Sequence, residues 1–251
     1  MNTTSSLRSV PLFSQLREED LDRVARAASA RRYPKDTMIM LESDAGDALY
    51  VVLDGQVKLV LSAEDGREII LATRTKGDFF GEMSLIDDQP TPFNAIAMGD
   101  AELLVLRRDD FRRCLSDLPG MSLGLLRALC ERLRKADSQI GGLVFLDVKG
   151  RVARLILELS DRHESDRIPR AFTHNVIAQM IGSTRETVSR TIRELADDGA
   201  IEASRTRVAV KDRVMLEAAA RYDVLPMIER RVEPALAAAA ATESWNRRAT
   251  D

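Results

Sequence analysis

The chain has 251 residues, of which 45% are hydrophobic, as expected for a globular protein with two modest domains. Its formal net charge of −3 excludes a strongly basic protein, so any attraction to nucleic acid must come from locally clustered lysines and arginines. Cys114 and Cys130 form neither a CxxC pair nor a metal-ligand cluster, which indicates reduced thiols. Residues 1–20 lack a signal-peptide pattern, and no stretch of about 18 residues is continuously apolar, so we expect a cytoplasmic protein without a membrane partner.

Two kinds of periodicity follow one another in the N-terminal half. Residues 16–28 place leucine, valine and alanine at helical spacing and predict short amphipathic helices. Residues 31–107 change to brief apolar runs separated by Asp-Gly, Gly-Asp or Pro-rich turns, which is typical of a closed antiparallel barrel or a jelly roll. Asp65-Gly66 predicts a tight hairpin. The runs that predict strands are "TMIML", "ALYVVL", "QVKLVLS", "EIILATR", "NAIAM" and "AELLVL".

A long helix is predicted after Pro119-Gly120. Its apolar side chains are separated by alternating steps of three and four residues, which is a heptad pattern. This spacing favours two parallel helices in a homodimer, although one helix packed on its own barrel would also show such a stripe. Gly141-Gly142 is expected to loosen or end the helix. The heptad positions are Leu126, Leu129, Leu133, Ala136, Ile140 and Leu143.

The stretch "IGSTRETVSRTIRELADDGAI", residues 181–201, has two chemically different helix faces. Ser183 is predicted as the N-cap, and Glu186 three residues later would complete a capping box. Gly182 permits a sharp turn from the preceding "HNVIAQMI", so that two helices joined through glycine form a helix-turn-helix. At 100° per residue, the apolar face holds Val188, Ile192 and Leu195, and the opposite face holds Glu186, Arg190 and Arg193.

The polar face of this helix predicts contacts with double-stranded DNA. Arginine can bond guanine bidentately, and glutamate can accept a hydrogen bond from cytosine N4. Charged residues on an amphipathic helix are often only a solvated face, but the preceding helix and the following "GAIEASRTRVAV", which looks like a basic wing, favour DNA binding. The predicted DNA-binding residues are Thr173, Ser183, Thr184, Arg185, Glu186, Ser189, Arg190, Arg193, Arg205 and Arg207, with Lys211 as a further phosphate contact.

These motifs closely resemble those of the cyclic-AMP receptor protein (CRP/FNR) family of bacterial transcription regulators. "FTHNVIAQMIGSTRETVSRTIRELADDGAI" resembles the DNA-binding half of the family, while "GDALYVVLDGQVKLV" and "GDFFGEMSLIDDQP" resemble its cyclic-nucleotide-binding barrel. The resemblance implies a homodimer on palindromic TGTGA-like sites, with guanine contacts from Arg185 and Arg190 and a cytosine contact from Glu186. RNA polymerase would be a partner if the protein is an activator.

The resemblance also implies an α+β fold and a domain organisation. It places an N-terminal cyclic-nucleotide-binding-type antiparallel β-barrel or jelly roll, with its N-terminal helices, at residues 1–118. A long dimerisation helix would follow at 119–146, and a C-terminal winged helix-turn-helix at 147–215. Residues 216–251 form an alanine-rich extension, to which we assign no function.

The effector pocket departs from the cyclic-AMP pattern of the family. Gly81 and Glu82 match the start of the family's phosphate-binding cassette, but its arginine-serine pair falls on Thr91-Pro92. The threonine-serine pair that contacts adenine falls on Ala136-Asp137. We therefore expect ordinary cyclic-AMP control to be lost or weak. The candidate effector-binding residues are Gly81, Glu82, Met83, Ser84, Thr91, Ala136 and Asp137.

Two readings of the barrel remain open. It senses another small molecule, such as a cyclic dinucleotide, or it is an unliganded scaffold in which Gly81-Glu82 are only turn and strand residues. An iron–sulfur cofactor needs about four cysteine ligands, and His163 and His174 lie outside the barrel, so neither a cluster nor haem is expected.

The competing functions have weaker support. The sequence contains no P-loop, nucleophile elbow or HExxH motif, so we expect no catalytic residues, no metal site and no enzyme activity. The remaining alternative is a cyclic-nucleotide-type regulatory module that controls another protein. That alternative would assign no function to the arginines of the helix within residues 181–201.

Overall fold

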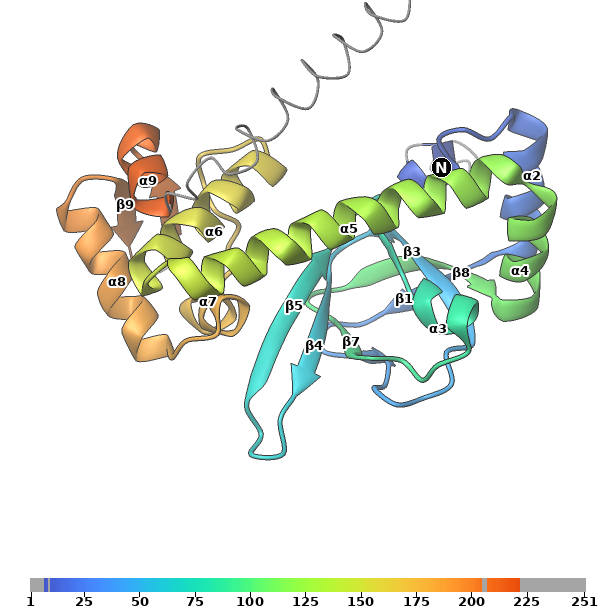
Figure 1. Ribbon diagram of the computed structural model, residues 1–251, viewed down its shortest axis with the longest axis horizontal. Helices are drawn as coiled ribbons and strands as arrows, with labels where there is room; N and C mark the ends of the chain where they lie inside the picture. Colours follow the sequence, from blue (N-terminus) through green and yellow to red (C-terminus); the bar gives the residue numbers. More distant parts are fainter. Residues whose placement is uncertain (1–6, 9, 205–206, 222–251) are drawn as a thin grey trace, which may run out of the picture. The chain divides into compact units, whose positions relative to one another are not determined.

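The structure of the protein is a computed structural model that describes residues 7–8, 10–204 and 207–221. Short helices precede a β-rich region, a long helix follows it, and further helices with a small hairpin complete the described part of the chain (Figure 1). This order is that of the predicted α+β class. The described residues up to Ala220 belong to one compact unit.

The N-terminal helices pack against the β region. The 3₁₀ helix η1 spans Pro11–Phe13, and α2 spans Glu18–Ala27. Leu21 and Val24 of α2 are fully buried, as their helical spacing predicts. They share a core cluster with strand side chains and with the first turns of the long helix.

Two four-stranded antiparallel sheets form the β region. All six predicted strands are present, and the structure adds β1, which is mostly exposed and contains two arginines, and β6, which has only two residues. Neither of these carries an apolar run long enough to predict a strand. The first sheet orders β1 (Ser29–Tyr33), β8 (Ala101–Arg107), β3 (Ala48–Asp54) and β6 (Phe79–Phe80), and the second orders β2 (Met38–Met40), β7 (Asn94–Ala97), β4 (Val57–Ser62) and β5 (Glu68–Arg74).

Alternation along β3 shows how the sheets pack. Leu49 and Val51 join the cluster beneath the N-terminal helices, whereas Tyr50 and Val52 join a second cluster to which both sheets contribute. Because successive side chains of a strand point to opposite faces, β3 is buried on both sides. The β region is therefore a two-sheet sandwich, which corresponds to the jelly-roll form of the prediction.

The predicted hairpin at Asp65-Gly66 is confirmed. Strands β4 and β5 pair antiparallel across it, and the Ala63 N–H donates to the Arg67 carbonyl at 2.8 Å. Gly66 has a φ of 80°, in the left-handed region that glycine adopts without a steric cost.

Three helices belong to or follow the β region. The short α3 spans Glu82–Asp87 and lies between β6 and β7, whereas α4, which spans Arg108–Asp117, and the long α5, which spans Pro119–Phe145, come after β8. Of the two expected effects of Gly141-Gly142, the ending of the helix is wrong, because α5 continues to Phe145 and the Leu146 N–H donates to the Gly142 carbonyl at 3.0 Å. Gly142 is buried, and its lack of a side chain leaves room for the Arg154 guanidinium.

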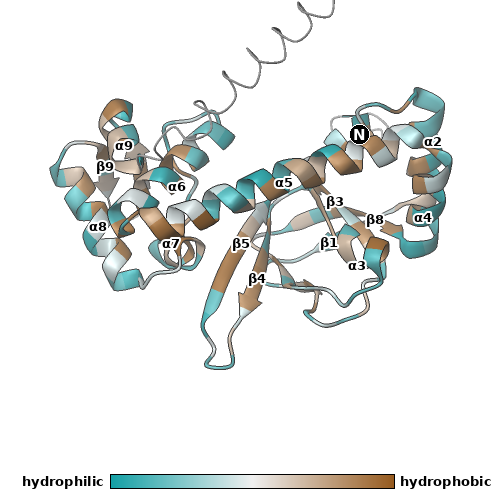
Figure 2. Cartoon of the chain, in the orientation of Figure 1, coloured by the Kyte–Doolittle hydropathy of each residue, from teal (hydrophilic) through white to brown (hydrophobic). Residues whose placement is uncertain are grey.

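The heptad side chains of α5 are largely uncovered by the rest of the chain. Leu126, Leu133, Ile140 and Leu143 are each 55–63% exposed, whereas Leu129 is half-buried. Figure 2 shows apolar residues recurring in brown along this helix. An exposed apolar stripe of this kind is typical of a helix that packs against a partner helix.

The C-terminal region builds a separate apolar core from four helices and one hairpin. Asp147 caps the first of these helices by accepting a hydrogen bond from the Gly150 N–H at 2.8 Å. None of the helices that the structure describes is both long enough and apolar enough to cross a bilayer. The elements are α6 (Val148–Arg162), α7 (His174–Ile181), α8 (Arg185–Asp197), β9 (Ile201–Ser204), β10 (Arg207–Val210) and α9 (Arg213–Ala220).

Candidate functional site

Helices α7 and α8 form the predicted helix-turn-helix, with Gly182 between them. Gly182 has a φ of 63° and ends α7 in the left-handed conformation that favours glycine. Val188, Ile192 and Leu195 of α8 are at most 2% exposed and join the C-terminal core, as their spacing predicts. Packing of this face fixes which side of α8 remains available to a ligand.

The predicted N-cap of α8 is wrong by one residue. The Thr184 hydroxyl accepts a hydrogen bond from the Thr187 N–H at 3.2 Å, so Thr184 is the N-cap. Ser183 is used elsewhere, because its N–H donates to the Ala178 carbonyl at 3.0 Å and closes the end of α7. Glu186 is therefore the second residue of α8 and forms no capping box.

The charged side chains of α8 lie on its exposed face. Arg185, Glu186, Arg190 and Arg193 are all exposed. Arg190 approaches Glu194 with 3.9 Å between Nε and Oε1, a long surface pair that contributes little to stability. The first turns of the helix thus offer both guanidinium and carboxylate groups to an external ligand.

Two further predicted residues have local partners. The Thr173 hydroxyl caps α7 by accepting from the Val176 N–H at 3.3 Å. Ser189 Oγ lies 2.9 Å from His174 Nδ1, which connects the first helix of the motif to the second. Burial, followed by Arg185 and then Arg193, lowers the pKa of His174. The imidazole is therefore held toward its neutral form beside α8.

The predicted wing is present as the antiparallel β9–β10 hairpin, in which Arg207 pairs with Ser204. Arg207 lies at the start of β10, and Arg205 lies outside the described residues. Lys211 follows the hairpin, and its N–H donates to the Ala200 carbonyl at 3.1 Å. The backbone thus places the wing directly after α8.

The predicted cassette glutamate is buried in an ion pair. Glu82, which is 2% exposed, accepts from Arg132 Nη1 at 2.5 Å, and the same guanidinium donates to the Phe79 carbonyl. The other carboxylate oxygen of Glu82, Oε2, is buried without a described partner. Gly81 precedes α3 with a φ of 89°, where a Cβ would lie 2.6 Å from the Ala48 carbonyl oxygen.

Thr91 occupies the cassette position where the family resemblance places an arginine. Its hydroxyl donates to the Leu41 carbonyl, and its N–H donates to the Asp44 carbonyl at 2.8 Å. A Cβ built on Gly46 would lie 2.7 Å from Ser84 Cβ and 3.4 Å from Thr91 Cγ2. This corner of the β region is therefore filled by its own side chains, and Thr91 directs its polar atoms to the neighbouring loop.

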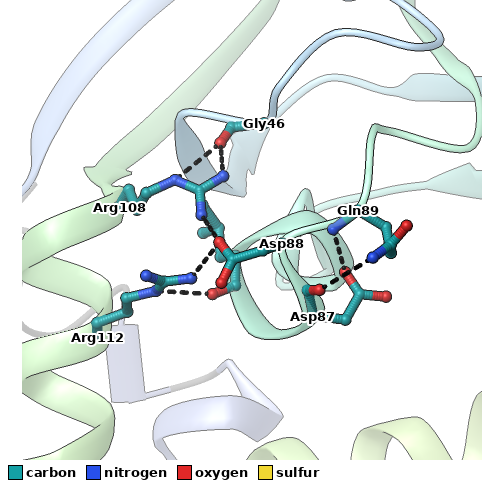
Figure 3. Close-up of polar contacts among 7 residues, drawn as sticks. Gly46, Asp87, Asp88, Gln89, Arg108 and Arg112 are labelled. Carbon is teal, nitrogen blue, oxygen red and sulfur yellow. Dashed lines mark hydrogen bonds and ion pairs between the residues drawn. The ribbon is translucent and has the colours of Figure 1, made fainter.

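An ion-pair cluster braces the cassette from outside (Figure 3). Asp88, which follows α3, accepts from Arg108 Nη1 at 2.6 Å and from Arg112 Nη2 at 2.5 Å. Arg108 also donates to the Gly46 carbonyl, and Arg112 donates to the Leu85 carbonyl at 2.9 Å. Arg112 and then Arg108 lower the pKa of Asp88. Two arginines of α4 thus join α3 to the loop that contains Gly46, an arrangement that the sequence pattern did not predict.

The candidate effector residues do not all lie in one place. Met83 and Ala136 line a cavity of about 470 Å³, whereas Gly81, Glu82, Ser84 and Thr91 do not. Asp137 is exposed and lies outside the cavity lining. The cavity is bounded by β4, β5, α5, α6 and the end of α7. No local sequence motif predicted its basic side chains, which are Arg74, Arg132, Lys135, Arg151, Arg154 and Arg162.

The residues that the structure describes contain no group of three or more His, Cys, Asp or Glu side chains that could hold a metal ion.

Comparison with known families gives two matches in the chain. Residues 30–117 match the family described as "Cyclic nucleotide-binding domain". Residues 150–219 match the family described as "Crp-like helix-turn-helix domain". The first match covers the β sandwich with α4, and the second covers the C-terminal core with its helix-turn-helix and wing.

Individual relatives span most of the chain. The CRP-like cAMP-activated global transcriptional regulator of Mycobacterium tuberculosis is 34% identical over 75% of this chain and 87% of its own length. The cyclic AMP receptor protein of Thermus thermophilus is 34% identical over 84% of this chain and 97% of its own length. The solved structure of CLP from Xanthomonas campestris, which is titled a c-di-GMP responsive global regulator, matches with a TM-score of 0.69 at 25% identity and covers 77% of this chain and 99% of that one.

Both domain matches and the identity to full-length regulators agree on one assignment. Members of this family are regulators without enzymatic activity. The chain belongs to the CRP/FNR family and is a DNA-binding transcription regulator.

Proposed function

We propose that the protein binds palindromic TGTGA-like sites as a homodimer and that ordinary cyclic-AMP control is lost or weak. The observation that carries the DNA part is the exposure of Arg185, Glu186 and Arg190 on one face of α8, while the opposite face is buried. In a helix-turn-helix, the N-terminal residues of the second helix meet base edges in the major groove.

The chemistry of these three side chains suits the proposed half-site. Arg185 and Arg190 would each bond a guanine through O6 and N7, and Glu186 would accept from cytosine N4. Each such contact discriminates against the wrong base by about 1–3 kcal/mol. Thr184 and Ser189 would lie toward the base edges with them. The remaining predicted residues would contribute mainly phosphate contacts, which set affinity and register, and these are Thr173, Ser183, Arg193 and the wing residues Arg205 and Arg207.

The homodimer is supported by the uncovered apolar stripe of α5. Family members bind DNA as homodimers. Two parallel copies of α5 would bury this stripe and present two recognition helices to a two-fold symmetric site. We accordingly propose residues 1–118 as effector domain, 119–146 as dimerisation helix and 147–215 as DNA-binding domain, with 216–251 as an extension.

The altered response to cyclic AMP is supported by the cassette. Thr91 donates its hydroxyl to a backbone carbonyl, and Pro92 has no N–H to offer a phosphate. Glu82 is engaged by Arg132 rather than open on both oxygens. The Mycobacterium and Thermus relatives are named for cyclic AMP, so this chain would differ from them in its effector while keeping their DNA-binding architecture.

The test is fluorescence anisotropy on wild-type protein and on the double variant Arg185→Ala/Arg190→Ala. The proposal predicts that the double variant folds and dimerises normally but no longer prefers the palindrome over scrambled DNA. Arg26→Ala, which removes an exposed arginine from α2, is the matched control and should keep the preference. Retained preference in the double variant would show that α8 does not read the site.

A further inference from the structure

The cavity described above has a basic lining on an apolar wall. Its volume of about 470 Å³ falls within the range of about 300–1,000 Å³ that is usual for small-molecule sites. Six cationic side chains line it, whereas Glu158 is the single carboxylate in the lining. The apolar wall includes Leu59, Ile70, Ala72, Phe93, Leu155 and Ile181.

Four of these six cations have no carboxylate partner in the part of the chain that the structure describes. Arg132 pairs with Glu82 and Arg154 pairs with Glu158. The other four, which have no carboxylate oxygen within 4.0 Å among the described residues, are Arg74, Lys135, Arg151 and Arg162. Arg162 instead donates to the Thr73 hydroxyl at 2.7 Å, which places its guanidinium beside β5. Arg74 Nε and Arg151 Nε are both buried without a hydrogen-bond partner among the described residues. A buried donor of this kind is costly unless a ligand satisfies it.

The cations of the cavity also disfavour one another. Burial and then Arg132 lower the pKa of Arg74 to about 10, and Arg162 contributes to the same shift. Partial desolvation and then Arg162 lower the pKa of Lys135, although part of its side chain stays exposed to solvent. Asp78, Glu82 and Glu158 act in the opposite direction without cancelling these shifts. An anion in the cavity would relieve this repulsion and satisfy a buried donor.

We propose that this cavity binds a cyclic dinucleotide, whose phosphates are held by Arg74, Lys135 and Arg162. A cyclic dinucleotide supplies two phosphodiester charges to this group of cations and two flat bases to the apolar wall. Arginine is suited to phosphate because its donors form a planar fork. This site lies on β5, α5 and α6 and does not use the Thr91-Pro92 corner of the cassette. The proposal deepens the proposed function, because it assigns an effector class to the same regulator.

The position of the cavity connects such a ligand to DNA binding. Met180, Ile181 and Gly182 line it, and they form the end of α7 and the turn that precedes α8. A bound ligand would therefore contact the effector domain and the helix-turn-helix together. A ligand that favours one arrangement of these parts shifts the population toward that arrangement.

The experiment is isothermal titration of the full-length protein, without DNA, with cyclic di-GMP, cyclic di-AMP, cyclic AMP and inorganic pyrophosphate. We expect one of the two dinucleotides to bind with micromolar or tighter affinity and to bind at least about tenfold more weakly to Arg74→Gln, Lys135→Gln and Arg162→Gln, as expected for loss of a charge-assisted hydrogen bond. Arg134→Gln is the matched control, because Arg134 is exposed on α5 outside the cavity lining, and it should keep wild-type affinity. Lys135 is exposed, so its variant should fold even if Arg74→Gln does not.

Several outcomes would overturn the proposal. These are the absence of binding by both dinucleotides, unchanged affinity in all three variants, or binding of pyrophosphate or cyclic AMP as tight as that of the better dinucleotide. The DNA proposal is tested separately by ligand-free anisotropy and the Arg185→Ala/Arg190→Ala variant. The two proposals can therefore fail independently, and the result for each can be interpreted without the other.

Discussion

Gln179 of α7 donates from Nε2 to Glu68 Oε2 of β5 at 3.0 Å, so that a side-chain hydrogen bond joins the helix-turn-helix to the effector domain. Lys58 Nζ lies 3.6 Å from the same carboxylate oxygen and helps to hold it in place. Arg162, in α6, makes the neighbouring connection through the Thr73 hydroxyl. These contacts give the two regions a defined route by which a change in one can affect the other.

Removing the hydrogen bond between Gln179 and Glu68 should increase local opening of α7. A hydrogen bond of this type is worth about 0.5–1.5 kcal/mol, so Gln179→Ala should speed amide hydrogen exchange in residues 174–181 by about two- to tenfold. Exchange in β3, which is buried on both faces, should stay unchanged. Hydrogen exchange with mass spectrometry measures both segments in one sample, and equal acceleration in β3 would indicate global destabilisation instead.

Glu186 should control preference at a single base pair. If it accepts from cytosine N4, then Glu186→Ala should lose about 1–3 kcal/mol of discrimination at that pair. Competition anisotropy with duplexes that carry each of the four base pairs at this position measures the change. Glu194→Ala, which lies about two turns beyond Glu186 in α8, is the comparison and should leave the preference at this base pair intact. A variant that keeps the wild-type preference would refute the cytosine contact.

The packed cassette corner should not accept even one methyl group. A Cβ at position 46 would lie 2.7 Å from Ser84 Cβ, so Gly46→Ala should destabilise the protein by about 1–3 kcal/mol. Gly99→Ala provides the control, because no atom lies within 4 Å of the Cβ that it would add. Chemical denaturation of both variants measures the difference. Equal stability would mean that this corner has space for a ligand group.

The stripe of α5 should determine oligomeric state. Leu133 and Ile140 are 63% and 59% exposed, and two parallel helices would bury both. Leu133→Asp/Ile140→Asp should therefore convert the homodimer to a monomer, because a carboxylate in the seam would lose its hydration. Val214→Asp, at an exposed position of α9, should remain dimeric. Sedimentation velocity distinguishes the species, and a dimeric double variant would exclude this stripe as the dimer contact.

Local patterns in the sequence predicted most of the fold and the face of α8 that remains exposed. Val188, Ile192 and Leu195 are buried because helical periodicity and core packing agree at these positions. The N-cap was misplaced because Ser183 and Thr184 can both cap a helix, and the choice depends on how α7 ends. The continuation of α5 beyond Gly141-Gly142 also depends on tertiary packing, because packing around the buried Gly142 offsets the weak helix propensity of glycine.

The cavity is the feature that local patterns could not reveal. Arg74, Lys135 and Arg162 lie on three different elements far apart in the sequence, and each alone resembles an ordinary surface charge. Only tertiary packing places them around the same space. The bracing of Asp88 by Arg108 and Arg112 is likewise a long-range arrangement without a sequence signature.

The most direct test of the central claim is anisotropy at fixed salt with a duplex that carries TGTGA and its inverted repeat TCACA, against a scrambled duplex. The titrations are made without ligand, with cyclic AMP and with each cyclic dinucleotide. We predict a preference for the palindrome, through Arg185, Glu186 and Arg190, that cyclic AMP does not strengthen. A preference that appears only with cyclic AMP, or no preference under any of these conditions, would contradict the account.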